Sequence, residues 1–355
     1  MARHAARSAA LHRADGLTAQ PVQGRLRYGR VLLVLALALG LAPGTLVRTQ
    51  LAGGETDARI IATRVSELPT IEGPLRLTDV WVLTSDHPFF GGFSALVDEG
   101  EGTILAASDR GWAFDVGVSG KALQPRYFRR FARAGRGRDA IDVEALTRDP
   151  VSGTLWAAYE QVHAIERITP DGRRDRREPE AMARWPGNSG AETMVRLDDG
   201  RFLVIAESEG PESTHTVLLF AGDPVAGGPV ADSDPVRLTL QTPKGYAPVD
   251  GTQLPDGSVL ILLRRVKLGL PPTFEPMILR VDPAAISAGE TWRGEVIAKL
   301  TAPLFAENFE GIAYRGADEH DGLGEGEGGG GALYLIADDN FSTFQRTLLV
   351  RLALP

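Results

Sequence analysis

The sequence of 355 residues contains no cysteine. This absence excludes disulfide bonds, thiolate metal sites, cysteine nucleophiles and a lipid anchor that needs an acceptor cysteine. Histidine is scarce too, and only four of the 6 histidines follow the first 50 residues: His87, His163, His215 and His320. Their spacing does not assemble a Ser-His-Asp triad, and we interpret each of them as a surface or packing residue.

Signature motifs of several enzyme classes are absent as well. The chain has no Gly-x-Ser-x-Gly nucleophile elbow, because Gly92-Phe93-Ser94-Ala95-Leu96 ends in leucine and Gly187-Asn188-Ser189-Gly190 has the wrong frame. It also has no phosphate-binding P-loop, no His-Glu-x-x-His zinc motif and no dinucleotide fingerprint. Nucleophilic serine chemistry therefore has little support in this sequence.

The chain has one long apolar run, residues 31–42, which follows an arginine-rich start and precedes Pro43-Gly44. A basic region followed by an apolar run of this length is typical of a secretory signal. The run is shorter than the roughly 17–25 residues of a membrane-spanning helix. We predict that residues 1–47 are a signal peptide or an N-terminal membrane anchor. Only this segment is expected to contact the membrane. The protein is then exported, either periplasmic or tethered facing the periplasm, and residues 48–74 are a linker.

Charge is unevenly distributed. Residues 1–50 hold seven arginines and one acid, Asp15, whereas the remainder carries 31 basic and 45 acidic side chains. An acidic body argues against a nucleic-acid partner, because phosphate backbones recruit lysine and arginine surfaces. It is compatible with cations or neutral substrates. The many glycines (41) and prolines (23) favour short strands and turns over long helices.

A short acidic motif recurs about every 50 to 60 residues, a period typical of propellers and similar arrays. Its five copies are Phe93-Ser94-Ala95-Leu96, Val143-Glu144-Ala145-Leu146, Ala191-Glu192-Thr193-Met194, Val249-Asp250-Gly251-Thr252 and Phe309-Glu310-Gly311-Ile312. A turn follows each copy, and then an apolar strand that tends to end in charge. The sequence therefore predicts an all-β fold over residues 75–355, a β-propeller of four-stranded blades. The motif count gives five blades, and six remain possible if a degenerate blade lies between Thr214 and Thr242.

Two further segments complete this prediction. The alternating residues 75–83 are expected to close the ring by pairing with the last blade, since a propeller must cover its strand edges. Residues 316–331 are acidic and glycine-rich, and they replace the two-residue turn of the other blades. Their composition is similar to that of calcium-binding glycine/aspartate repeats. They lack a regular nonapeptide spacing, however, and we interpret them as a flexible hairpin loop.

The repeat resembles the phytase-like family described as having esterase-like activity, a group of exported bacterial proteins. The resemblance spans roughly residues 75–355 and rests on the following stretches: 91–96, Ser108-Asp109-Arg110, 142–146, Tyr159-Glu160, 308–312, Asp338-Asp339-Asn340-Phe341 and Gln345-Arg346-Thr347. It implies a propeller-like fold and a hydrolytic centre built from the repeated acids. The chain departs from the pattern at Ser94, which replaces a carboxylate, and at Arg264-Arg265, which replaces an acidic strand end.

The motif acids Glu144, Glu192, Asp250 and Glu310 are expected to converge on the axis, with Ser94 in the fifth place. Several buried like charges repel one another, and a bound hard cation removes this repulsion. Calcium suits such a set because it takes six to eight oxygen ligands. We therefore assign the four acids as metal ligands, with Ca²⁺ as the expected ion. The alternative is structural, in which each acid accepts backbone N–H groups or pairs with an arginine.

A second set of polar residues occupies the ends of the apolar strands, which a propeller gathers on one rim. It comprises Asp109, Arg110, Glu160, Glu207, Glu209, Arg264, Arg265, Asp338, Asp339 and Asn340. Arginine forks match phosphate oxygens, so this rim is suited to a metal-bound phosphate ester. The alternative is an arginine–carboxylate network that ties the blades together.

The sequence thus predicts a metal-dependent hydrolase of small-molecule phosphate or carboxylic esters. Glu144, Glu310, Asp109 and Arg110 are the expected catalytic residues. The expected substrate-binding residues are Glu160, Glu207, Arg264, Asp338, Asp339 and Asn340. The alternative is a non-enzymatic periplasmic propeller that binds a ligand or a partner, which the lack of any complete catalytic signature favours.

Overall fold

A computed structural model describes residues 59–119, 122–132, 142–186, 190–210, 213–227, 233–316 and 331–355. All of them belong to the compact unit Gly44–Pro355. The predicted signal segment, residues 1–47, falls outside the described residues, as do residues 317–330 of the glycine-rich insertion and the side chain of Glu209. Within the described part, no helix is long and apolar enough to cross a membrane.

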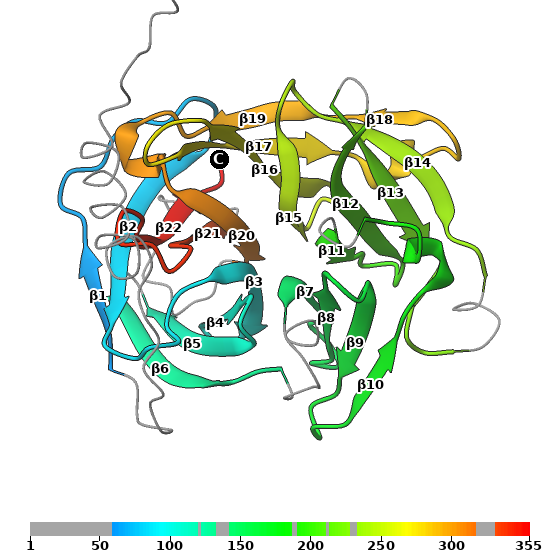
Figure 1. Cartoon of the computed structure of the whole chain (residues 1–355), viewed down its shortest axis with the longest axis horizontal. Coiled ribbons are helices and arrows are strands. Elements are labelled where there is room, and N and C mark those ends of the chain that lie inside the picture. The colour runs from blue at the N-terminus through cyan, green and yellow to red at the C-terminus, as the bar shows by residue number, and fades with distance from the viewer. Residues whose placement is uncertain are drawn as a thin grey trace, which may run out of the picture. The chain divides into compact units, whose positions relative to one another are not determined.

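Five sheets, antiparallel except for one edge strand, surround a central axis, and each is one blade with its motif-bearing strand innermost (Figure 1). Blade I contains β3 (Phe93–Gly100), β4 (Thr103–Ser108), β5 (Trp112–Ser119) and β6 (Ala122–Arg130). Blade II contains β7 (Val143–Arg148), β8 (Leu155–Tyr159), β9 (Ala164–Ile168) and β10 (Arg174–Arg177). Neighbouring inner strands contact one another all the way round, so the ring is closed.

In the next two blades, a connection of blade IV adds an edge strand to blade III. Blade III contains β11 (Ala191–Arg196), β12 (Phe202–Gly210), β13 (Thr214–Phe220) and β14 (Val236–Gln241). Blade IV contains β15 (Ala247–Gln253), β16 (Val259–Lys267), β17 (Thr273–Val281) and β19 (Glu295–Lys299). The connection from β17 to β19 sends β18 (Thr291–Arg293) to pair in parallel with β14. Three short 3-10 turns lie in connections: η2 (Glu180–Met182), η3 (Pro283–Ala285) and η4 (Pro303–Phe305).

Blade V joins the two ends of the described chain. It contains β20 (Asn308–Arg315), β21 (Ala332–Asp338), β22 (Thr347–Ala353), β2 (Arg76–Ser85) and the edge strand β1 (Ile60–Arg64). The pairing of β2 with β22 confirms the predicted ring closure. The stretch predicted as a linker contributes β1 to this sheet.

A buried ion pair reinforces this closure. Arg351 on β22 donates through Nε to Oδ2 of Asp79 on β2 at 2.8 Å, and both side chains are almost fully buried. Arg64 of β1 donates through Nε to the other carboxylate oxygen, Oδ1, at 2.7 Å. One carboxylate therefore ties the last strand of the chain to the first two.

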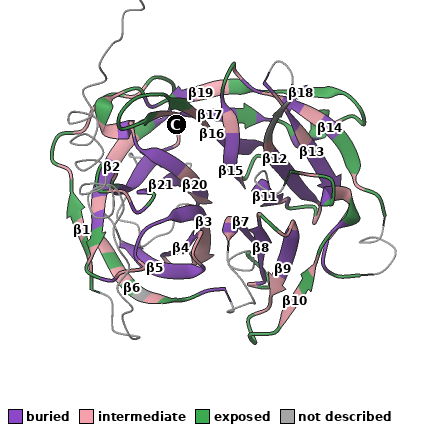
Figure 2. Ribbon diagram, viewed as in Figure 1, coloured by how far each residue is buried: buried purple, intermediate pink, exposed green. Residues whose placement is uncertain are grey.

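The hydrophobic core consists of five clusters, one between each pair of neighbouring blades. The strands in the middle of a blade are covered on both faces, which is why they are apolar runs in the sequence rather than alternating patterns. In β16, Leu260 and Leu262 pack toward blade V, whereas Ile261 and Leu263 pack toward blade III. Figure 2 shows this burial near the axis and the exposure of the outermost strands.

The structure confirms five blades. Residues 214–241, where a degenerate sixth blade was considered, supply β13 and β14 of blade III. β13 pairs with β12, and β14 pairs with β13. Both strands therefore complete blade III and do not form a sixth blade.

Each inner strand carries a register shift at the acidic motif. The extra residue is Ser94, Glu144, Glu192 or Glu310 in four blades, and Val249 in blade IV. A β-bulge lets two residues oppose one on the partner strand and re-aims the bulged side chain. The motif is therefore a repeated bulge, and it decides which side chains face the axis.

Candidate functional site

The strand ends and the motif acids lie at one end of the axis because each blade begins with an antiparallel hairpin. The start of an inner strand must then lie beside the end of the next strand. Val143 pairs with Tyr159, Asn308 with Asp338 and Ala247 with Arg264. Both polar sets predicted from the sequence are therefore gathered at the same end.

Three carboxylates of blade II form a group that can hold a metal ion. One oxygen each of Asp142, Glu144 and Glu160 lies within 4.8 Å of the others. The backbone N–H of Glu160 donates to the carbonyl of Asp142 at 3.1 Å, and Gln161 Nε2 donates to Asp142 Oδ2 at 2.8 Å. We name Asp142, Glu144 and Glu160 the carboxylate trio. Asp142 was not among the ligands expected from the sequence, although it opens the stretch 142–146.

A close approach between blades II and III shapes this group. A Cβ atom on Gly190 would lie 2.7 Å from Cα of Glu160, so no larger residue fits at this position without a shift. The absent side chain lets the start of β11 lie against Glu160. Glu192, the buried bulge residue of β11, is thereby brought to the same end of the axis.

The carboxylates at this end repel one another in a poorly solvated place. Burial, followed by the nearby charges of Glu192 and Asp142, raises the pKa of Glu144 well above its usual value. Burial and then the carboxylates of Glu207 and Glu160 do the same to the pKa of Glu192. Burial, with Asp142 as the next cause, raises the pKa of Glu160 to about 7. The negative charge of these carboxylates is therefore not balanced by nearby positive charge.

Arg264 neutralises a different part of the acidic end. Its Nη2 donates to Glu207 Oε1 at 2.9 Å, and its Nη1 donates to Glu310 and to Asn308 Oδ1, the latter at 2.6 Å. Asn308 Nδ2 completes the arrangement by donating to Glu310 Oε1 at 2.8 Å. The basic strand end of blade IV thus bridges blades III and V, as the proposed arginine–carboxylate network would. Arg265, the next residue, pairs instead with Glu275.

Asp250 is not brought together with the other motif acids. Its fully buried carboxylate accepts the backbone N–H groups of Gly251 at 2.8 Å and of Ile312 at 2.7 Å, and also that of Leu96. Burial raises the pKa of Asp250, and these three hydrogen bonds oppose the increase. Among the residues that the structure describes, no other acid is a cause of this increase. Asp250 therefore links the inner strands of blades IV, V and I, the structural role considered for these acids.

Ser94 has a comparable place in blade I. Its hydroxyl donates to the backbone carbonyl of Val143, the residue that begins the inner strand of blade II. The fifth motif position is therefore also used for a contact between inner strands. Of the five motif positions, Glu144, Glu192 and Glu310 remain directed into the acidic end.

The acidic residues after β21 form a tight turn. Asp338 Oδ1 accepts the N–H of Asn340 at 2.7 Å, and Asp339 Oδ1 accepts the N–H of Phe341 at 3.0 Å. Asn340 and Phe341 both have left-handed backbones, with φ of 48° and 49°. Such a turn explains why three short polar residues follow the apolar strand. Asn340 is exposed, and its Nδ2 donates to Gln345 Oε1.

This turn packs on the strand end of blade I. The guanidinium of Arg110 stacks 3.4 Å from the ring centroid of Phe341, and the N–H of Gly92 donates to Asp339 Oδ1 at 3.4 Å. Burial, then the charges of Glu310 and Asp109, raises the pKa of Asp338 well above its usual value. Asp109 and Asp338 therefore lie close enough to the acidic end to act on it electrostatically.

The donor chemistry decides which ion fits here. The carboxylate trio offers only oxygen ligands, which suit hard cations such as Ca²⁺ and Mg²⁺ better than the softer transition metals. Among the described residues, no histidine joins this group. A divalent cation would offset the repulsion that raises the pKa values of Glu144 and Glu160.

We predict that, in chelator, this group makes stability depend on pH. The pKa of Glu160 is about 7 in the folded chain and 4.5 for an unperturbed glutamate, so the folded state holds more protons between these values. Its contribution is fully present below pH 4.5 and is lost as pH rises through 7. As pH rises through this window, the free energy of unfolding of the unmodified chain should fall relative to that of Glu160→Gln by at most ~1.4 kcal/mol per pH unit. Solvent screening makes the fall smaller, because Glu160 is only half-buried. Urea unfolding at several pH values measures this, and equal slopes would contradict it.

The chain is similar to one known protein family and, more distantly, to several solved structures. The family model described as phytase-like, esterase-like activity of phytase, matches residues 88–341. No curated protein matches the chain. Among solved structures, virginiamycin B lyase from Staphylococcus aureus is 11% identical, with a TM-score of 0.39 over 84% of this chain and 100% of that one. A luciferin-regenerating enzyme is 11% identical, with a TM-score of 0.41 over 83% and 95%. These likenesses are too distant to bear on activity.

Proposed function

Because the chain belongs to the phytase-like family described by the esterase-like activity of phytase, we propose that it is a metal-dependent hydrolase of phosphate or carboxylic esters. The observation that carries this proposal is the carboxylate trio, whose oxygens approach within 4.8 Å at the end of the axis where the strand ends also meet. Family membership alone does not specify a substrate. The choice of substrate class therefore depends on the chemistry of the site.

Asp142, Glu144 and Glu160 would hold the cation in this proposal, and Ca²⁺ is our choice because the donors are all carboxylate oxygens. A bound divalent cation would supply Lewis-acid polarisation of the ester and would balance developing negative charge. Glu192 adds a further carboxylate next to this position, and its charge helps to retain a cation. Asp250 is left out of the ligand set because backbone donors occupy its oxygens.

The protein residues have separate tasks. Glu160 has a pKa of about 7 without a cation, and a bound cation would displace its proton and engage the carboxylate as a ligand. Arg264 holds Glu207 and Glu310 in fixed positions. Arg110, held over the Phe341 ring at the neighbouring strand end, supplies a positive charge for an anionic substrate group.

Export to the periplasm is part of the same proposal. The basic start and the apolar run 31–42 support it. Immunoblotting of periplasmic and membrane fractions from a bacterial host that expresses the full chain would test it, and retention of the uncleaved chain in the cytosol would contradict it.

The proposed activity is tested with the full chain and three chromogenic esters: p-nitrophenyl phosphate, bis-p-nitrophenyl phosphate and p-nitrophenyl acetate. We expect turnover of at least one ester, loss of that turnover in chelator and its recovery on addition of Ca²⁺. Elemental analysis of the purified protein is the parallel measurement. Absence of metal together with no turnover of any ester would reject the hydrolase and favour a binding propeller.

A further inference from the structure

Three adjoining cavities lie at the end of the axis opposite the carboxylate trio. The inner strands begin at the acidic motif, and the lining of the axial cavity includes the last residues of three of them, Arg148, Arg196 and Gln253. The outer two cavities adjoin turns at the same end, since Asp256 and Arg280 line both of them. None of the three is lined by a residue of the carboxylate trio. They therefore form a separate feature of the described structure.

The axial cavity has an apolar floor and a polar rim. Its volume is about 500 Å³, which is within the range of small-molecule sites. Four inner strands contribute buried apolar side chains to the lining, among them Leu96, Leu146, Val195 and Ile312. Arg148, which follows Leu146 and Thr147 on β7, lines the cavity as well. The rim also holds Arg196 and three aspartates, Asp98, Asp149 and Asp198. Each aspartate already has a partner: Asp149 pairs with Arg196, Asp198 accepts from the side-chain amide of Gln253, and Asp98 accepts the N–H of Gly100.

A second cavity of about 480 Å³ continues from the first. The two share Leu254, Pro255 and Tyr314, so they adjoin between blades IV and V. The second is lined largely by apolar residues, including Leu75, Ile297 and Leu354. Together they offer an apolar path that leads away from the axis.

Two arginines line the axial cavity, and Arg196 is already paired with Asp149, which leaves Arg148 to be considered. Among the described residues, no hydrogen bond or ion pair engages its guanidinium, which acts on Glu99 only at longer range. The neighbouring carboxylate of Asp149 is already used, since it accepts from the N–H of Val151 at 3.1 Å and the hydroxyl of Ser152 at 2.8 Å. A guanidinium with available donors recognises a carboxylate by two parallel hydrogen bonds.

We propose that this end of the propeller binds a carboxylate with an apolar tail, of the medium-chain fatty-acid class. Arg148 pairs with the head group, and the tail lies on the floor of the axial cavity and extends past Leu254 and Tyr314 into the second cavity. This proposal does not rest on the hydrolase activity, because it uses the opposite end of the axis and none of the carboxylate trio.

Isothermal titration of the full chain with octanoate, hexanoate and butyrate tests the tail. Burying each additional CH₂ group should raise the affinity about fourfold. Octanol tests the head group, because it has the same number of carbon atoms without the charge, and it should bind about tenfold more weakly than octanoate or worse. No octanoate binding at millimolar concentration, or equal binding of octanol and octanoate, would overturn the proposal.

Substitutions locate the site. Arg148→Gln should weaken octanoate binding about tenfold or more and leave octanol binding unchanged, whereas Arg148→Lys keeps the charge and most of the affinity. The matched control is Arg184→Gln, since Arg184 is exposed and lines none of the three cavities. Circular dichroism confirms that each variant is folded. Equal octanoate affinity of Arg148→Gln and the unmodified chain would place the ligand elsewhere and reject the assignment.

Discussion

Replacing Glu144 and Glu160 together by glutamine is expected to lower metal-dependent ester turnover by at least about 100-fold. The substitution removes two of the three carboxylates whose oxygens lie within 4.8 Å of one another, and it keeps their size. Initial rates on the ester that the unmodified chain hydrolyses best measure the effect, and titration with Ca²⁺ measures the loss of metal affinity. Full turnover by a folded double variant would rule out the proposed site.

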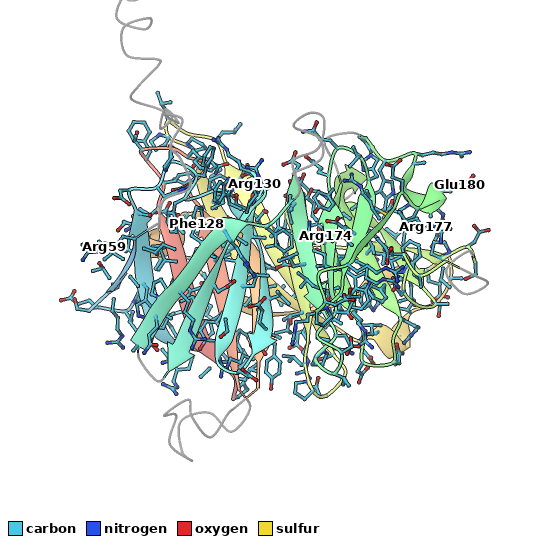
Figure 3. All side chains as sticks on the ribbon, turned by 90° about the horizontal axis from the view of Figure 1, so that it is seen from below. Arg59, Phe128, Arg130, Arg174, Arg177 and Glu180 are labelled. Atoms are coloured by element: carbon cyan, nitrogen blue, oxygen red, sulfur yellow. The ribbon has the colours of Figure 1, made fainter. Side chains whose placement is uncertain are left out.

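The same double variant should be more stable than the unmodified chain in chelator. Both side chains have raised pKa values because their charges are poorly solvated and face other acids, and glutamine removes those charges. Loss of turnover with a gain in stability separates a site effect from misfolding. The matched control is Glu178→Gln/Glu180→Gln, which changes two exposed glutamates of blade II. Figure 3 shows Glu180 at the outer side of this blade, and this control should leave both turnover and stability unchanged.

Asp250→Ala is expected to lower the free energy of unfolding by about 3–5 kcal/mol, because it leaves three buried N–H groups without an acceptor. Those groups belong to Gly251, Ile312 and Leu96, which lie on the inner strands of three blades. Equilibrium urea unfolding followed by tryptophan fluorescence measures the change. Asp250→Asn should cost less, since its amide retains one acceptor oxygen.

The control for this prediction is Asp234→Ala, which alters an exposed aspartate outside the inner ring and should change the free energy of unfolding by no more than about 0.5 kcal/mol. If Asp250→Ala unfolds at the same urea concentration as the control, the carboxylate does not hold the inner strands together. In that case Asp250 returns to the set of candidate metal ligands.

The architecture could be predicted because local patterns in the sequence specify it. The motif spacing gives the blade count, the apolar runs give the middle strands, and the alternation at residues 75–83 gives the closing strand. Each of these depends on near neighbours in the chain. The hairpin that opens every blade also places the strand ends beside the motif, so the gathering of both polar sets follows from antiparallel pairing.

The role of each acid could not be predicted from the repeat. Glu310 and Asp250 occupy matching places in the motif, but the bulge falls at Glu310 in blade V and at Val249 in blade IV. A shift of one residue in a strand sends a side chain to the other face. Asp250 consequently meets backbone donors of two other blades, whereas Glu310 meets Arg264.

Contacts between blades and across one hairpin decided the remaining assignments. Arg264 is an exception to the acidic strand ends in sequence, and the structure explains it by its hydrogen bonds to Glu207 of blade III and Glu310 of blade V. The trio member Asp142 became a candidate ligand only because Glu160 lies next to it across the hairpin. Spacing along the chain does not report such distances.

The sequence by itself determined the family resemblance, a β-propeller with five blades by motif count, and the two sets of polar residues that it gathers, because strand pairing and hydrophobic periodicity are local properties. The structure settled the count at five, since residues 214–241 complete blade III. Only the tertiary structure decided which acids are available to a cation, which are neutralised by Arg264 and which hold strands together. That decision depends on bulge register and on distances between blades, and both are set by packing between residues far apart in the chain.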